Sequence, residues 1–215
     1  MSVVLFVGSP RVRSNTRSIA AFLRERLESL GADVVTLDPK RAGLDDESFV
    51  SRSVDTLRGA DTIVILAPVY FDAPPHVALA WLRALWSHRE ALDRHVPALY
   101  GVTHSGYFES IHKRPSLETF EHFGRAMGWP WHGGLAFGGT SPIDGRPLEG
   151  MGPFTRRLRP SLDRLARTIH ERRAVPSDLV REASKRPIPL PKRWIVWIMN
   201  TMIRAARRRK GRGGR

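Results

Sequence analysis

A cluster of small hydroxyl, amide and basic side chains near the N-terminus has the composition of an anion site. The cluster follows an apolar run over residues 3–7 that ends at Gly8, and it consists of Ser9, Arg11, Arg13, Ser14, Asn15 and Thr16. A helical pattern of apolar residues follows from Thr16 to Leu30. At such a junction, unpaired backbone N–H groups and the helix dipole favour an anion. A solvated turn with ordinary capping by Ser14, Asn15 or Thr16 explains the same residues equally well.

Two well-known nucleotide loops are excluded at this position. The dinucleotide fingerprint needs three spaced glycines, and only Gly8 is present. The Walker loop ends in Gly-Lys-Ser or Gly-Lys-Thr, which is also missing. What remains is a loop lined by hydroxyl groups.

The composition indicates one α/β domain with an appendage. The chain has 215 residues, of which 41% are hydrophobic, and this is enough for one good core. It contains no cysteine, which excludes disulfides, thiolate metal sites, iron–sulfur clusters and a cysteine nucleophile. The histidines show no ligand spacing with carboxylates, so no metal is predicted. With no signal-peptide pattern and no apolar run of about 20 residues, a cytoplasmic location is the expectation.

The net charge of +14 is concentrated at the C-terminal end. Residues 181–215 hold 12 lysines and arginines against a single acidic residue, Glu182. The first 180 residues hold 23 basic and 20 acidic residues, so this part is nearly neutral. Any role of the basic charge is therefore expected to belong to the tail.

Apolar segments of two kinds alternate along the chain. Strands are predicted at residues 3–7, 32–37, 61–67, 97–103 and 130–137. Helices are predicted at residues 16–30, 48–57, 75–92, 116–127 and 154–173. This alternation predicts a parallel sheet with helices on both faces. Ligands bind beyond the carboxyl ends of such strands, so the loops at 9–16, 68–74 and 103–107 are expected to converge.

The loop motifs resemble those of a known family. Gly8-Ser9-Pro10-Arg11 followed by Ser14-Asn15-Thr16 looks like the FMN-phosphate loop of flavodoxin-like NAD(P)H-dependent FMN reductases and quinone reductases. Pro68-Val69-Tyr70-Phe71 resembles the Pro-Val-Tyr-aromatic segment of the same family. The resemblance covers residues 2–173. It implies a flavodoxin-like α/β fold with a five-stranded parallel sheet in the order 2-1-3-4-5, FMN as cofactor and NAD(P)H as electron donor.

The resemblance also implies which residues bind the flavin. The phosphate would be held by Ser9, Arg11, Ser14, Asn15 and Thr16. The ring and ribityl chain would be lined by Pro68, Val69, Tyr70 and Phe71. The far side would be closed by Thr103, Ser105, Gly106 and Tyr107. The chain departs from the family pattern at Asp72, at Leu79, at Arg83-Ala84 and in having one glycine, Gly106, in the fourth loop.

The implied activity needs no catalytic side chain. Hydride would pass from the nicotinamide to the flavin, and then to a quinone or similar small acceptor in a ping-pong scheme. Purely structural roles stay open for some of these residues. Tyr70 and Phe71 could pack the sheet edge, and His104 fits a structural histidine better than a catalytic one. The competing class is a non-catalytic flavodoxin-like binding protein anchored through its basic tail to a membrane or to nucleic acid.

The sequence divides into a domain at residues 1–175 and an appendage at 176–215. The appendage is predicted to contain a proline-punctuated linker, a short apolar helix with Trp194 and Trp197, and a basic end from Arg204. Docking of this helix on the core or on a partner subunit is favoured, followed by contact with an anionic membrane surface. Nucleic-acid binding is least favoured, because no aromatic residue lies among the last arginines. The resemblance implies a homodimer.

Overall fold

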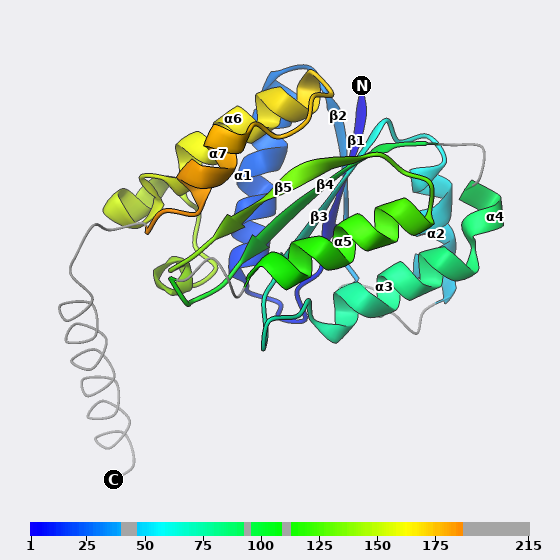
Figure 1. Ribbon diagram of the computed structural model, residues 1–215, viewed down its shortest axis with the longest axis horizontal. Coiled ribbons are helices and arrows are strands. Elements are labelled where there is room, and N and C mark those ends of the chain that lie inside the picture. Colours follow the sequence, from blue (N-terminus) through cyan, green and yellow to red (C-terminus); the bar gives the residue numbers. More distant parts are fainter. Residues whose placement is uncertain (40–46, 93–95, 109–112, 187–215) are drawn as a thin grey trace, which may run out of the picture.

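The structure is a five-stranded parallel sheet with helices on both faces (Figure 1). The computed structural model describes residues 1–39, 47–92, 96–108 and 113–186. The strands are β1 (Ser2–Val7), β2 (Asp33–Leu37), β3 (Thr62–Pro68), β4 (Ala98–His104) and β5 (Trp131–Phe137). Their order is β2-β1-β3-β4-β5, which confirms the predicted flavodoxin-like topology.

The helices form two layers, one on each face of the sheet (Figure 1). One layer contains α1 (Asn15–Ser29), α6 (Leu158–His170) and α7 (Ser177–Ala183). The other contains α2 (Glu47–Leu57), α3 (His76–Ser87) and α5 (Arg114–Ala126). Shorter elements are α4 (Arg89–Leu92) and the 3-10 turns η2 (Ser141–Ile143) and η3 (Glu149–Thr155). Among the described residues, no helix has the length and hydropathy needed to cross a membrane.

The central strand β1 shows why its sequence is apolar throughout. Val3, Leu5 and Val7 pack in the core under α1 and α6, whereas Val4 and Phe6 pack in the core under α3. Successive side chains of a strand point to opposite faces, so a strand covered on both sides has no polar position. The ring of Phe6 stacks on that of Trp81, with 3.7 Å between their centroids.

Two of the predicted helices are shorter than the sequence pattern indicated. The helix expected over residues 75–92 is interrupted at His88, whose backbone leaves helical geometry at φ −107° and ψ 17°. The helix expected from residue 154 begins only at Leu158. The preceding segment forms η3, which contains Pro153 and is kinked at Gly152, where φ is +52°.

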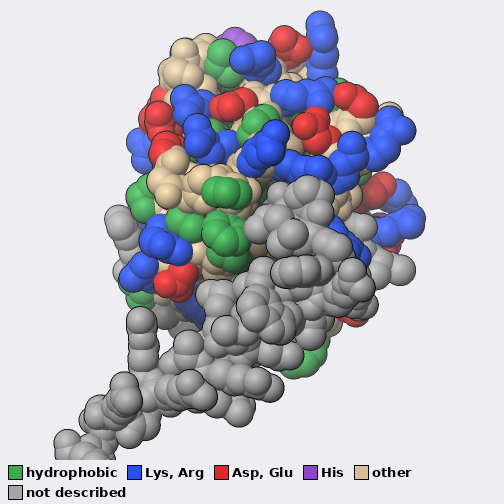
Figure 2. All heavy atoms as spheres, turned by 90° about the vertical axis from the view of Figure 1, so that its left-hand side faces the viewer, with side chains coloured by type: hydrophobic (Ala, Val, Ile, Leu, Met, Phe, Trp, Pro, Cys, Tyr) green, Lys and Arg blue, Asp and Glu red, His purple; other side chains and the backbone are tan. Residues whose placement is uncertain are grey.

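Helix α7 lies where a linker was predicted to begin. Leu179 and Ala183 belong to the core under α6, and Arg164 of α6 binds Asp178 (2.7 Å) and Glu182 (3.0 Å) of α7. Basic and acidic side chains are interspersed on the described part of this side of the molecule (Figure 2). The predicted apolar helix with Trp194 and Trp197 and the basic end lie outside the described residues.

Gly8 fixes the start of the anion loop because no side chain fits there. A Cβ at this position would lie 2.9 Å from the Cβ of Ala78 in α3 and 3.2 Å from the carbonyl oxygen of Leu66. The backbone N–H of Gly8 donates to that same oxygen over 2.7 Å, which extends the pairing of β1 with β3. The loop therefore leaves the sheet in close contact with β3 and α3.

We expect Gly8→Ala to lower the free energy of unfolding by about 1–3 kcal/mol, because backbone and Cβ atoms would have to move apart. Gly59→Ala is the matched control, since a Cβ at Gly59 would have nothing within 4 Å. That variant should stay within about 0.5 kcal/mol of the parent. Urea denaturation of the three proteins measures the difference. Equal midpoints would show that Gly8 is not constrained in this way.

Candidate functional site

A polar cavity of about 260 Å³ opens at the carboxyl edge of the sheet. Four loops line it, those that follow β1, β3, β4 and β5. The lining residues are Ser9, Arg11, Arg13, Ser14, Asn15, Thr16, Pro68, Val69, Tyr70, His104, Ser105, Gly106, Thr140, Ser141, Asp144 and Gly145. The three loops predicted to converge do so, and the loop after β5 joins them.

The start of α1 provides hydrogen-bond donors at this cavity. Ser14 is the N-cap, and its hydroxyl oxygen accepts from the backbone N–H and from the guanidinium of Arg17, each over 3.3 Å. Both acceptor positions of Ser14 are thus used, so the group it can offer a ligand is its O–H. This cap uses the N–H of Arg17, so within the first helical turn the backbone N–H groups of Asn15 and Thr16 are the ones that have no acceptor within the helix. This arrangement suits an anion.

His104 lines the polar cavity at the end of β4 and links it to the start of α1 and to the loop after β5. Its Nε2 is 2.8 Å from the hydroxyl oxygen of Thr16, and its Nδ1 is 3.2 Å from that of Thr140. The Thr140 hydroxyl also donates to the carbonyl oxygen of Ser105 over 3.0 Å. Burial lowers the pKa of His104 to about 4, so the imidazole is neutral at pH 7.

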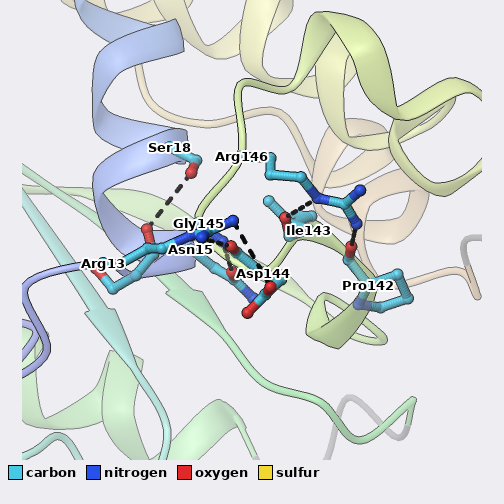
Figure 3. Close-up of polar contacts among 9 residues, drawn as sticks. Arg13, Asn15, Ser18, Pro142, Ile143, Asp144, Gly145 and Arg146 are labelled. Carbon is cyan, nitrogen blue, oxygen red and sulfur yellow. Dashed lines mark hydrogen bonds and ion pairs between the residues drawn. The ribbon is translucent and has the colours of Figure 1, made fainter.

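Asn15 connects the anion loop to the loop after β5 (Figure 3). Its side-chain amide donates to the carbonyl oxygen of Thr140 over 2.7 Å, and its Oδ1 accepts from the N–H of Gly145 over 2.8 Å. Arg13 donates to the carbonyl oxygen of Asp144 over 2.9 Å, and its guanidinium lies 3.7 Å from the Asp144 carboxylate. The Asn15 side chain was predicted as a phosphate ligand. The structure shows that its main hydrogen bonds hold this loop.

A second cavity, of about 400 Å³, adjoins the first and is more apolar. It is lined by Val69, Tyr70, Phe71, Asp72, Ser105 and Tyr107. Tyr70 and Ala73 exchange backbone hydrogen bonds of 2.9 and 3.1 Å around Phe71 and Asp72, whose φ angles are +49° and +64°. This tight turn with two left-handed residues leaves the Phe71 side chain fully exposed. The turn therefore presents an aromatic ring beside the cavity.

The structure brings all but one of the predicted site residues to these two cavities. Thr103 is the exception: it is fully buried within β4 and lines neither cavity. The alternation of side chains along β4 explains this, because Val102 and His104 share one face and Thr103 points to the other. The residue at the cavity is thus His104, for which the sequence favours a structural role.

Residues of the loop after β5 were missed as part of the polar cavity. Thr140, Ser141, Asp144 and Gly145 line it, although no residue after position 107 was predicted as a flavin ligand. The signal was present, since Ser141-Pro142-Ile143-Asp144-Gly145 is a turn sequence directly after the fifth strand. A loop at the carboxyl end of β5 lies at the same edge of the sheet as the others.

The residues at the two cavities fit a flavin mononucleotide. The polar cavity offers hydroxyl groups, the N–H groups of a helix start and the exposed cation Arg11 to a phosphate. Its one lining carboxylate, Asp144, is paired with Arg13. The apolar cavity shares Val69, Tyr70 and Ser105 with it and offers aromatic surface to a planar ring. No cluster of metal-ligating side chains is found within the described residues.

A protein-family comparison agrees with this geometry. The family model described as NADPH-dependent FMN reductase matches residues 1–121, which is more than half of the chain and includes β1 to β4. No curated protein sequence matches the chain.

Solved structures with the same fold include several flavin enzymes. An NADH:FMN oxidoreductase in its apo form is 17% identical with a TM-score of 0.59, and the match covers 88% of this chain and 97% of that one. An FMN-dependent NADH-azoreductase from Bacillus anthracis, solved with FMN, is 10% identical with a TM-score of 0.57, covering 79% and 99%. A proposed quinone reductase from Klebsiella pneumoniae is 15% identical with a TM-score of 0.56, covering 82% and 87%. At these identities the likeness is one of fold.

Replacing Asn15 by alanine should loosen the loop after β5. Both hydrogen bonds of the side chain to this loop are lost, which we expect to cost about 2 kcal/mol. Backbone hydrogen exchange measures the effect at Gly145, whose N–H donates to Asn15. Asn15→Asp is the control, because it keeps an acceptor for Gly145 and loses the donor to Thr140. Exchange at Gly145 should therefore rise more in the alanine variant than in the aspartate variant, and equal exchange would contradict this role.

The buried imidazole of His104 should make stability depend on pH. Its pKa is about 4 in the folded chain and 6.5 in the unfolded chain, so below pH 6.5 the unfolded state binds the extra proton. The contribution is fully present above pH 6.5 and is lost as the pH falls toward 4. We expect a loss of about 3 kcal/mol from this group over that interval.

Urea denaturation at pH 7 and pH 4.5 tests this prediction on the parent and on His104→Gln. Carboxylates titrate in both proteins over the same interval, so the difference between the two pH responses isolates His104. The variant should lose less stability on acidification than the parent. Equal losses would mean that His104 does not titrate as a buried neutral group.

Proposed function

The chain belongs to the NADPH-dependent FMN reductase family, and from this premise we propose that it passes electrons from NAD(P)H to a quinone or a similar small acceptor. It is an NAD(P)H-dependent flavin oxidoreductase with FMN as cofactor. The observation that carries the proposal is the junction of two unlike cavities at one edge of the sheet, which share Val69, Tyr70 and Ser105. A ligand with an anionic group at one end and a planar ring at the other matches this pair.

The residues of the polar cavity would bind the phosphate of FMN. Ser14 offers its O–H, the first turn of α1 offers backbone N–H groups, and Ser9, which is buried, lies beside them. Arg11 is exposed at the same cavity and adds positive charge. Binding by fixed dipoles with a cation at the rim needs no buried unpaired charge, which would be costly in the free protein.

The residues of the apolar cavity would orient the ring. Tyr70, Phe71 and Tyr107 are 39%, 104% and 70% exposed, so they offer apolar surface that is not used by the described core. When bound, FMN supplies the redox chemistry, taking a hydride from the nicotinamide and passing two electrons to the acceptor. The protein side chains position the reactants, and no side chain is assigned as an acid or base. If donor and acceptor use this same cavity in turn, the reaction follows a ping-pong scheme.

The homodimer, the cytoplasmic location and the contact of Trp194, Trp197 and the basic tail with a membrane surface remain predictions from the sequence. The competing interpretation, a non-catalytic binding protein that is anchored through this tail, differs from the proposal in its response to NADPH.

A visible absorption titration tests the proposal. FMN should bind saturably, and NADPH should then bleach the flavin absorbance, with recovery when a quinone is added. Riboflavin lacks the phosphate and should bind more weakly than FMN. Saturable FMN binding without bleaching by either NADPH or NADH would favour the non-catalytic protein. No FMN binding by the folded chain would overturn the proposal.

Two variants that each remove one positive charge test whether Arg11 contributes to binding of the phosphate. Arg11→Ala should weaken FMN by about fivefold, or roughly 1 kcal/mol, and leave riboflavin affinity unchanged. Arg24→Ala is the control, because Arg24 carries the same charge on α1 but pairs with Glu28 and lines neither cavity. An equal loss in both variants would indicate a general effect of net charge.

A further inference from the structure

His104 links the polar cavity to the loops that border the ring side of the site. It is the last residue of β4 and is only 5% exposed, yet it lines the polar cavity. One ring nitrogen meets Thr16 of the anion loop, and the other meets Thr140 of the loop after β5. Because burial keeps the imidazole neutral, it has one N–H and one lone pair to divide between these two hydroxyl groups.

In the first arrangement the hydrogen bonds run from Thr16 through the imidazole and Thr140 to Ser105. The Thr16 O–H donates to Nε2, the Nδ1–H donates to the Thr140 oxygen, and the Thr140 O–H donates to the carbonyl oxygen of Ser105. Each of these groups then has a partner without any ligand. The Thr16 proton, however, is turned toward His104 and cannot meet an anion.

In the second arrangement the two hydrogen bonds of the imidazole are reversed, and the bond from the Thr140 O–H to Ser105 is broken. The Nε2–H donates to the Thr16 oxygen, which frees the Thr16 O–H for the cavity, and the Thr140 O–H donates to Nδ1. The carbonyl oxygen of Ser105 loses this hydroxyl donor but keeps the backbone N–H of Thr140, which lies 3.0 Å away. The two arrangements contain the same number of protons and differ in the ring nitrogen that carries the proton.

We propose that His104 is a positioning residue whose tautomer changes from Nδ1–H to Nε2–H when a phosphate group enters the polar cavity. The inference rests on the proposed binding of FMN. An anion favours the second arrangement, because a hydroxyl donor to a charged acceptor is stronger than one to a neutral nitrogen. The change reaches Ser105, which borders both cavities, so phosphate binding is communicated to the ring side.

Nitrogen-15 NMR of the histidine rings measures the tautomer directly. In the free protein, Nδ1 of His104 should show the shift of a protonated nitrogen and Nε2 that of an unprotonated one. Saturation with FMN should exchange the two, whereas saturation with riboflavin should not. The His104 signals are identified by their absence in His104→Gln, and independently as those of a ring that stays neutral at pH 5.

The outcomes separate this inference from the proposed function. FMN binding with exchanged nitrogen shifts supports both. FMN binding with Nδ1 still protonated, or an equal exchange with riboflavin, overturns the tautomer change and leaves the proposed function intact. Failure of the folded chain to bind FMN overturns the proposed function and this inference with it.

Two amide variants distinguish positioning from packing. The glutamine amide reaches the place of Nε2 and can donate to Thr16, whereas the asparagine amide reaches only the place of Nδ1, near Thr140. We expect His104→Gln to bind FMN within about threefold of the parent and His104→Asn to lose about tenfold, with riboflavin affinity equal in both. Far-UV circular dichroism confirms the fold of each variant. Equal FMN affinities would show that the contact with Thr16 does not act on the phosphate.

Discussion

The hydrogen bonds of one buried imidazole hold the candidate site together. His104 lies between Thr16 and Thr140, residues of loops that are separated by more than a hundred positions in the sequence. The loop after β5 also bonds to the segment after β4 through its backbone, since the N–H of Thr140 donates to the carbonyl oxygen of Ser105 over 3.0 Å. His104 adds the side-chain link from this region to Thr16 at the start of α1. The group is neutral because it is buried, and a charged imidazole at this position would lack a compensating anion in the free protein. The shape of the polar cavity therefore depends on a histidine that carries no charge.

Burial of the sheet on both faces fixes the positions from which the loops of the candidate site begin. β1, β3 and β4 have no exposed position, so a shift of register by one residue would place apolar side chains in the wrong core. The carboxyl ends of the strands are fixed as a result, and each loop starts from a defined point. Gly8 adds to this, because even a Cβ at this position would lie 2.9 Å from the Cβ of Ala78 in α3.

Much of the fold followed from periodicity, and the order of the strands from the resemblance to a known family. Position along a strand was harder to translate into the direction of a side chain: the sequence marked Thr103, Ser105 and Gly106 as one loop, but the strand continues to His104. The role of Asn15 could not be predicted, since its partners Thr140 and Gly145 are distant in sequence and meet it only in the folded chain. Helix α7 is short, and a seven-residue segment near prolines has too weak a pattern to be distinguished from a linker.

The two cavities differ in the groups that they offer to a ligand: hydrogen-bond donors at the polar cavity and aromatic side chains at the apolar one. At the polar end, the donor atoms belong to a helix start and to hydroxyl groups that already have partners, so their positions are fixed before a ligand arrives, although the Thr16 proton turns toward the cavity only with the phosphate. At the apolar end, Phe71 is exposed on a turn of two left-handed residues, a conformation that a bulky side chain adopts only at a cost. The apolar cavity with its strained, exposed turn thus adjoins the rigid polar cavity, and the two share Val69, Tyr70 and Ser105. A ligand anchored by its phosphate would meet the aromatic turn with its ring, and the energy of the anchor would be available to order that turn.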